Sequence, residues 1–279
     1  MSYKTLLVHL DASARSRVRL SIALRLARTF GSHLDGLFAT FSPDPRGFYV
    51  MAGTADYFEQ HRQLHDEHRD AIERLFRAEL AQSQVPGNWR DASDDPVEHV
   101  VQHARAADLV IVGQSDPGDP EAYVAERFPE TVVMSAGTPV LVVPNEGEFA
   151  TVGERVLIGW NGSRESARAL HDAMPLLARA ARVTIAGVSG AVEAPHAAMS
   201  CDDVAAALAR HRVTNLDLVE FGRNLDETAG DALLSYATRG GYDLIVTGAY
   251  GHTRWQEMVL GGATQTMFDL MTVPVLMSH

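Results

Sequence analysis

The chain has 279 residues, 46% of them hydrophobic and 22% charged, which is the composition of an ordinary globular protein with room for two cores. Its formal net charge of −12 argues against broad binding to nucleic acid or anionic membranes, because both need basic surface. The single lysine, Lys4, follows no glycine-rich turn, which excludes the GxxxxGK[ST] phosphate loop. No apolar run approaches the roughly 20 residues that cross a bilayer. With a single cysteine, Cys201, that cannot form an internal disulfide, we expect a cytoplasmic protein.

Short runs rich in Val, Ile and Leu alternate along the chain with helical patterns. Bounded by Gly, Pro or Asp, such runs are typical of strands buried on both faces of a parallel sheet. The first half has predicted strands at 4–10, 33–40, about 88–92, 108–113 and 139–143. The second half has them at 155–160, 182–188, 213–221, 243–248 and 273–277. The alternation predicts two similar α/β domains, each an open five-stranded, mostly parallel, doubly wound sheet (Rossmann-like) with helices on both faces.

The two halves resemble each other in amino-acid sequence as well as in the order of predicted elements. "ADLVIVGQSD" matches "YDLIVTGAYG" and "TPVLVVP" matches "VPVLMSH", at a constant offset of 135 residues, as from Gly113 to Gly248. The openings "TLLVHLDAS" and "RVLIGWNGS" match at an offset of 150, as from Asp11 to Asn161. The polar stretch "NEGEFATVGE" separates the repeats, so we predict domains at 1–147 and 152–279.

The stretch "GAYGHTRWQEMVLGGATQT" is rich in glycine where the fold would place a ligand. Gly248 ends a predicted strand, Gly251 follows after two residues, and nine residues separate it from the pair 261–262. Ligands bind outside the carboxyl ends of strands in such sheets, and free backbone N–H groups and helix N-termini suit phosphates. Arg254 is the one cation in the stretch and Thr264 its best placed hydroxyl. The alternative is that these glycines only allow tight turns and close helix–sheet packing.

These motifs, in this order and spacing, resemble the universal stress protein family. Its ATP-binding members carry Gly-x-x-Gly-(nine residues)-Gly-Ser/Thr after a buried strand, and both openings and both closings of the repeat resemble the family's first and last strands. The whole chain is similar to a tandem universal stress protein. The resemblance implies a stress-response binding or regulatory protein that binds ATP, or a related adenine nucleotide, with Mg²⁺ in its C-terminal half. No general base or metal-activated water is evident, so catalysis is expected to be absent or limited to slow ATP hydrolysis.

The resemblance also assigns positions in the C-terminal half. It places Asn161 near the adenosine, where the family has Asp, and the backbone of Val188 or Ser189 at the adenine edge. Gly248 and Gly251 would approach the ribose and the α-phosphate. The outer phosphates would meet three residues, namely Gly261, Gly262 and Thr264. Asn161 and Gly262 depart from the family's Asp and Ser/Thr, and the second departure removes a hydroxyl donor.

The N-terminal half lacks these features, although Asp11 keeps the family's strand-end acid. Acidic or bulky residues stand at the aligned positions: Asp116, Glu126, Arg127 and Pro129. The segment "QSDPGDPEAYVAERFPE" holds at least five carboxylates, which would repel phosphates. We predict that this half does not bind nucleotide and instead supports assembly or takes another ligand. Because the family usually dimerises, the last strands, 139–143 and 273–277, could join the halves as an internal pseudo-dimer, and a homodimer is also open.

Two further features suggest weaker hypotheses. His61, His65 and His68 lie at i, i+4 and i+7 on one face of a predicted helix, a spacing that can chelate Zn²⁺. Histidines at the edge of a packed stripe, or in an interface, are the favoured interpretation. The insertion 41–58 would be a lid, a dimer contact or a plain surface loop.

Two other function classes remain as rivals. An enzyme of the adenine-nucleotide alpha-hydrolase-like group would need an SGGxDS-like turn after the first strand, and "DASARS" and "NGSRES" supply only a small polar turn. A nucleotide-free scaffold, or one whose pocket holds an apolar ligand, is favoured by Gly262 and by the loss of the motif in the first half.

Overall fold

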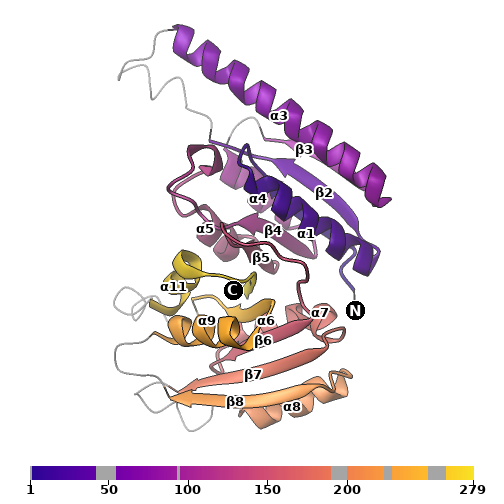
Figure 1. Ribbon diagram of the computed structural model, residues 1–279, viewed down its shortest axis with the longest axis vertical. Coiled ribbons are helices and arrows are strands. Elements are labelled where there is room, and N and C mark those ends of the chain that lie inside the picture. The colour runs from indigo at the N-terminus through magenta and orange to yellow at the C-terminus, as the bar shows by residue number, and fades with distance from the viewer. Residues whose placement is uncertain (1, 42–54, 93–94, 190–199, 223–227, 251–261) are drawn as a thin grey trace.

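The structure, a computed structural model, describes residues 2–41, 55–92, 95–189, 200–222, 228–250 and 262–279 (Figure 1). Ten strands of the described chain form one continuous sheet. The strands of the first half are β1 Thr5–Leu10, β2 His33–Phe38, β3 Gly87–Asp91, β4 Leu109–Gly113 and β5 Val140–Val143. Those of the second half are β6 Arg155–Trp160, β7 Arg182–Ser189, β8 Leu216–Gly222, β9 Leu244–Gly248 and β10 Val275–Ser278. Each half thus supplies five strands, as predicted.

The sheet runs in the order β3-β2-β1-β4-β5-β10-β9-β6-β7-β8. Neighbouring strands within each half are parallel, and each half has the same doubly wound order about its first strand. The halves meet where β5 and β10 pair antiparallel, with Leu141 opposite Leu276. The expectation that the last strands join the two halves is therefore confirmed, and the join makes one sheet of the two.

Helices cover both faces of this sheet, and each face has its own apolar core. One face carries α1 Arg15–Phe30, α3 Ala55–Ser83, α6 Arg164–Asp172, α7 Met174–Leu177 and α8 Cys201–Arg210. The other carries α4 Pro96–Ala104, α5 Phe128–Ser135, α9 Ala229–Gly240 and α11 Gly262–Leu270. A 3₁₀ turn, η1 Pro120–Ala122, lies between β4 and α5. Each core runs through both halves, because strand side chains alternate between the two faces: Leu6 and Val8 join the first core, and Leu7 joins the second.

Local sequence signals explain where the helices begin and end. Gly31 terminates α1 in the left-handed region with φ +64°, and Gly241 terminates α9 with φ +62°. Thr228 and Asp231 form a reciprocal capping box at the start of α9. The 29-residue α3 lies at the outer end of the sheet beside β2 and β3 (Figure 1). Among the described helices, none has the length and apolarity that a bilayer crossing requires.

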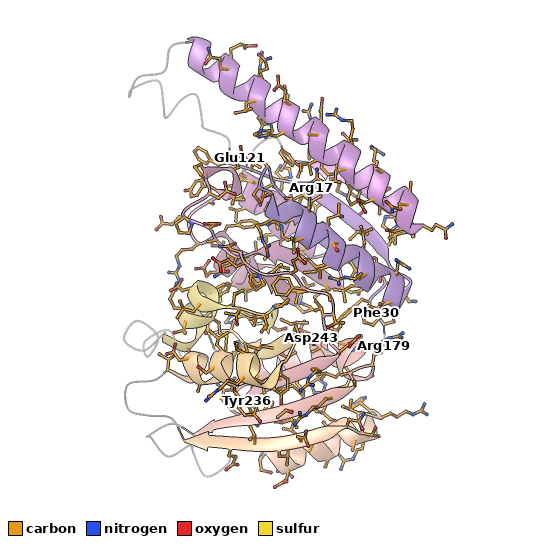
Figure 2. The ribbon with its side chains drawn as sticks, viewed as in Figure 1. Arg17, Phe30, Glu121, Arg179, Tyr236 and Asp243 are labelled. Carbon is orange, nitrogen blue, oxygen red and sulfur yellow. The ribbon has the colours of Figure 1, made fainter. Side chains whose placement is uncertain are left out.

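The two halves also contact each other through residues outside the strands. Tyr3 Oη donates to the Asp172 carbonyl at 2.7 Å, and the Arg179 guanidinium lies 5.7 Å from the centroid of the Phe30 ring (Figure 2).

Within each half, an aspartate before the fourth strand holds the start of the first strand. Asp243, also labelled in Figure 2, accepts hydrogen bonds from three backbone N–H groups at the start of the second half, residues 153–155, at 2.9–3.1 Å. Its counterpart Asp108 does the same for residues 4 and 5 at 2.6 and 2.9 Å. This repeated contact fixes the first strand of each half to its fourth.

Candidate functional site

The carboxyl ends of β6, β7 and β9 lie side by side and bring three predicted site residues to one edge of the sheet. Trp160 is in register with Gly187 of β7, so Asn161 and Val188 each stand one residue beyond this pair. Gly159 is in register with Thr247, which places Gly248 beside them on the other flank of β6. The sequence-based grouping of Asn161, Val188 and Gly248 is thus what the strand register produces. The side chain of Val188 lies outside the description, as do residues Gly251, Arg254 and Gly261.

Asn161 shapes the turn at this strand end and stays exposed. Its Oδ1 accepts a hydrogen bond from Ser163 N at 3.0 Å, and Ser163 in turn caps α6 by accepting from Ser166 N at 3.1 Å. A side-chain oxygen bonded two residues ahead is the arrangement that favours Asn and Asp in turns. An amide here sets the turn as a carboxylate would, without placing a negative charge at the end of β6.

Gly248 has a packing role that needs no ligand. A Cβ at this position would lie 2.5 Å from the backbone atoms Glu165 C and Ser166 N of α6. Backbone atoms cannot yield as the end of a flexible side chain can, so β9 and α6 approach this closely only with glycine. The side of Gly248 on which a side chain would stand therefore faces α6.

Thr264 connects the helix α11 with the strand end. Tyr250 N donates to Thr264 Oγ1 at 3.4 Å, and Tyr250 has φ +55°, so the chain turns sharply directly after β9. The contact uses an acceptor site of the hydroxyl and not its proton. Gly262 is the first residue of α11, so the backbone N–H groups of this helix N-terminus lie beyond the motif's last glycine.

The same place in the first half is closed by a buried ion pair. Asp11 Oδ2 pairs with the Arg19 guanidinium, and both side chains are 3% exposed. Asp11 Oδ1 accepts from Ser13 N at 3.0 Å and from Ser16 Oγ at 2.9 Å. Burial alone would raise the pKa of the Asp11 carboxyl, but Arg19, with His9 and the two serines, outweighs it, and the pKa lies below its usual range. The carboxylate is ionised and fully partnered inside the protein.

Sequence reasoning did not find Arg19, although the repeat contains the signal. At the offset of 150 residues that relates Asp11 to Asn161, Arg19 aligns with Ala169. The acid and its cation are thus both absent from the second half, as expected if each needs the other inside the protein. Arg19 also fills the space beside Gly113, where an added Cβ would be 2.5 Å from its terminal nitrogen.

The acidic segment of the first half folds back over this strand end. Asp116 Oδ1 accepts from Gly118 N, and Asp119 Oδ1 from Glu121 N, both at 2.9 Å. Arg127, at the position of Gly262, has φ +53° and begins α5. The segment leaves a cavity of about 200 Å³ beneath it. The strand end of this half is therefore covered and the cavity below it is small. That this half does not bind nucleotide stays a prediction.

Two of the three histidines predicted on one face of α3 have described side chains, His65 and His68. Within the described residues, no group of three or more His, Cys, Asp or Glu side chains could hold a metal ion. His65 packs edge-on against Phe38 with ring centroids 5.4 Å apart, and its Nδ1 lies 3.9 Å from Asp66 Oδ1. His68 is half-buried, and the side chain of His61 is outside the description. These contacts fit the edge of a packed stripe. Of the 41–58 insertion, residues 42–54 lie outside the described chain.

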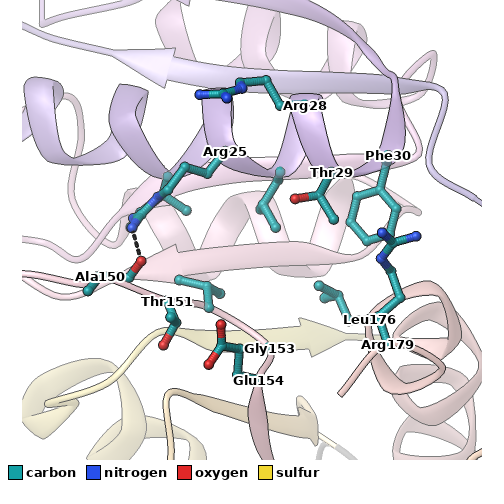
Figure 3. A pocket seen from close by; sticks show the side chains of 13 residues that line it. Arg25, Arg28, Thr29, Phe30, Ala150, Thr151, Gly153, Glu154, Leu176 and Arg179 are labelled. Carbon is teal, nitrogen blue, oxygen red and sulfur yellow. Dashed lines mark hydrogen bonds between the residues drawn. The ribbon is translucent and has the colours of Figure 1, made fainter. Parts of the chain in front are cut away.

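A larger cavity of about 600 Å³ lies between the halves at the opposite edge of the sheet (Figure 3). The C-terminal turns of α1, the connecting segment 150–154 and the residues after α7 line it. Arg25 donates to the Ala150 carbonyl there, which ties α1 to the connecting segment (Figure 3). These elements precede β2, β6 and β7, so the cavity is at the amino ends of the strands. Doubly wound sheets bind ligands at the carboxyl ends, which separates this cavity from the candidate site.

Two doubly wound α/β halves joined in one sheet define the class as a tandem Rossmann-like α/β protein. The chain belongs to the universal stress protein family, whose model matches residues 2–144 and again 153–279. The structure is similar to that of a universal stress protein from Archaeoglobus fulgidus DSM 4304, with a TM-score of 0.70, 15% identity and coverage of 98% of this chain and 97% of that one.

Other solved structures are similar over different lengths. A functionally unknown protein from Pseudomonas aeruginosa PAO1 has a TM-score of 0.58 and 14% identity, covering 99% of this chain and 92% of that one. A universal stress protein family protein from Arabidopsis thaliana, solved with AMP bound, has a TM-score of 0.37 and 14% identity, covering 52% and 93%. No curated protein sequence matches the chain significantly. The two similarities that cover the whole chain, with TM-scores of 0.70 and 0.58, show the fold.

Proposed function

We propose that the second half binds ATP, or a related adenine nucleotide, at the carboxyl ends of β6, β7 and β9, as a regulatory or protective module in the response to stress. The single observation that carries the proposal is the contrast between the two strand ends. Asn161 is exposed and uncharged at one, whereas Asp11 is 2% exposed and locked to Arg19 at the other. The family model matches both halves, and the Gly-x-x-Gly-(nine)-Gly-Gly spacing, which occurs in the second half, supports the assignment to that half.

Each residue has a proposed role at this site. The backbone at Val188 and the amide of Asn161 would meet the adenosine, and the chain at Gly248 and Gly251 would approach the ribose and α-phosphate. The outer phosphates would be bound by Arg254, by the N–H groups of Gly261 and Gly262, and by the hydroxyl of Thr264. Thr264 would supply the hydroxyl donor that the family's Ser/Thr provides two residues earlier, at the position of Gly262. A helix N-terminus next to these groups favours negative charge.

Mg²⁺ would arrive with the nucleotide. The described residues offer no acidic or histidine cluster that could hold a metal by themselves. Mg²⁺ commonly keeps several waters and takes phosphate oxygens as ligands, so a hydroxyl and a triphosphate are a sufficient environment for it. When bound, the ion would neutralise phosphate charge beside the helix N-terminus.

The test is isothermal titration with Mg·ATP on matched variants. We expect one site per chain in the wild type. Gly251→Asp/Gly261→Glu, which copies the first half's residues, is expected to abolish binding. Thr264→Val is expected to weaken it about tenfold or more, because a hydrogen bond to a charged group contributes roughly 1.5–3 kcal/mol. The neighbouring Gln265→Ala is the control and should bind as the wild type does.

The first half provides a mirror experiment. Asp116→Gly/Glu126→Gly removes two carboxylates there but leaves Asp11 and Arg19 in place. We expect no second nucleotide site, because the ion pair still fills the strand end. A folded wild type that binds no adenine nucleotide would refute the proposal.

A nucleotide-free scaffold is the second candidate, and the packing of Gly248 is the observation that favours it. The 2.5 Å approach of α6 explains this glycine without a ligand. Absence of adenine nucleotide in titration and in the purified protein would put the scaffold first. Slow ATP hydrolysis is a separate proposal. The test is phosphate release from Mg·ATP by the wild type, compared with release by the Gly251→Asp/Gly261→Glu variant.

The remaining assignments are proposals as well. We keep the division into domains at 1–147 and 152–279, the cytoplasm as compartment, and assembly of two chains. Limited proteolysis between 145 and 154, cell fractionation and sedimentation would test them in turn. Cleavage outside that segment, recovery in another fraction or a monomer at all concentrations would each contradict one of them.

A further inference from the structure

The cavity in the first half is enclosed mainly by apolar groups. It lies at the carboxyl ends of β1 and β4, under the segment that follows β4 and beside the first turn of α5. Val124, Phe128 and Pro129 contribute apolar walls, and Val124 and Phe128 are buried. Its volume of about 200 Å³ is larger than the roughly 150 Å³ that takes up a benzene molecule in an engineered apolar cavity. A single six-membered ring with one or two substituents is the matching size.

Several polar side chains around this cavity are already bonded within the protein. Asp11 is paired with Arg19, and Asp116 accepts from Gly118 N. Gln114 Nε2 donates to the Phe268 carbonyl at 2.7 Å, and its Oε1 accepts from Asn145 N at 3.0 Å. These groups hold the walls together and have little capacity left for a ligand.

His9 differs from these groups because one of its ring nitrogens is buried and unpartnered among the described residues. Its side chain lines the cavity and is part of a residue only 1% exposed, and its Nδ1 has no hydrogen-bond partner among the described residues. Nε2 lies 2.8 Å from the Ala39 carbonyl oxygen. A carbonyl can only accept, so Nε2 carries the proton and Nδ1 presents a lone pair. Leaving such a buried acceptor unpaired is costly, which calls for a donor at this position.

The imidazole is held neutral. Burial, which disfavours the charged ring more than Asp11 favours it, lowers the pKa of His9 to about 4. The ring packs against Phe128 with centroids 4.6 Å apart, so an aromatic wall stands next to the imidazole. In the second half Gly159 takes the place of His9, and a Cβ there would be 2.8 Å from Leu233 Cδ1. The histidine that lines the cavity of the first half thus has no side chain as its counterpart in the second half.

We propose that the first half binds a small uncharged ring compound that donates one hydrogen bond, from a hydroxyl or an N–H group, to His9 Nδ1. The volume excludes a nucleotide, and the carboxylates of the covering segment disfavour anions. An apolar body explains the lining, and one donor explains the histidine. This ligand site is separate from the proposed nucleotide site, so either can fail without the other.

The experiment uses the full-length protein and three probes, phenol, anisole and toluene. Titration followed by NMR of the histidine ring nitrogens reads the contact directly in the wild type. We expect phenol to bind once per chain and to shift the Nδ1 resonance of His9. Anisole and toluene, which have no donor, are expected to bind about tenfold more weakly and to leave that resonance in place. Excess Mg·ATP is expected not to displace phenol.

His9→Phe is the matched variant, since it keeps a ring of similar size against Phe128 and removes the acceptor. It is expected to bind phenol and toluene equally, with Thr264→Val in the other half as control for folding and for the probe. Equal binding of the three probes to the wild type, an unmoved Nδ1 resonance, displacement by ATP or no binding of phenol would each overturn the proposal. In the last case a water molecule would be the donor to His9.

Discussion

Replacing Arg19 by alanine tests the physical basis of the closed strand end. The substitution leaves the Asp11 carboxylate 2% exposed with only Ser13 and Ser16 as partners. Removing one member of a buried ion pair costs about 3–5 kcal/mol, because the remaining charge stays desolvated. We expect the free energy of unfolding to fall by about that amount at neutral pH. For a chain of this size such a loss lowers the melting temperature by roughly 6–20 °C.

The second half suggests the compensating change. Asp11→Asn/Arg19→Ala reproduces the Asn161 and Ala169 that the repeat carries there, so no charge is left buried. We expect this double variant to recover at least about 2 kcal/mol of the loss, a coupling that a double-mutant cycle reports. Urea unfolding followed by circular dichroism measures all four proteins. The argument fails if Arg19→Ala costs under about 1 kcal/mol or if the two single losses simply add.

The pH dependence of stability is a second test of the role of Arg19. In the wild type the pKa of Asp11 is below its ordinary value, so its stabilising contribution is complete above the ordinary pKa and is lost as pH falls through the lowered one. Without Arg19, burial would raise this pKa, and protonation at mildly acidic pH would remove the unpaired charge. The difference in stability between wild type and Arg19→Ala is therefore expected to be largest at pH 7 and to shrink towards about pH 4. A difference that grows on acidification would contradict this.

Three further predictions concern packing and hydrogen bonds. Gly248→Ala is expected to destabilise the fold by about 1–3 kcal/mol, because the added Cβ would meet the α6 backbone. The control Gly118→Ala, in an exposed turn, is expected to cost under about 0.5 kcal/mol. Equal losses of stability for the two variants in urea unfolding would argue against the close approach of β9 and α6. Asp243→Ala removes the acceptor of three backbone N–H groups and is expected to lower the free energy of unfolding by about 1–3 kcal/mol in the same assay. Asp243→Asn is expected to lose less stability. An alanine variant as stable as the wild type would refute this. Tyr3→Phe loses the bond to the Asp172 carbonyl and is expected to cost about 1 kcal/mol in thermal unfolding, and an unchanged melting temperature would show that the bond adds nothing.

The strands were predictable because parallel strands buried on both faces leave uninterrupted apolar runs in the sequence. The largest error in a start was β8, predicted from 213 and observed from Leu216. Val213 is buried and apolar, but its N–H bonds back to the Leu208 carbonyl at 3.2 Å, so it closes the turn after α8. Apolar content alone does not distinguish such a residue from the start of a strand.

The candidate site was predictable in position but not in detail. The doubly wound order places ligands at carboxyl strand ends, so the grouping of Asn161, Val188 and Gly248 follows from topology. The contact of Gly248 with α6 and the ion pair of Arg19 depend on how closely particular elements approach. Spacing along a chain carries no information on such distances, and Arg19 reads as one cation among many on an amphipathic helix.

The antiparallel pairing of β5 with β10 has a consequence for how this molecule can change. When two identical subunits meet about a two-fold axis, every substitution occurs in both copies. Here the two partners are encoded separately within one chain, and the pairing at Leu141 and Leu276 joins segments that differ in sequence. A substitution at the strand end of one half therefore changes that half alone, and the residues at the other strand end stay as they were. Fusion thus lets one half bury a charged pair where its neighbour carries an uncharged, exposed side chain, with the sheet unbroken between them.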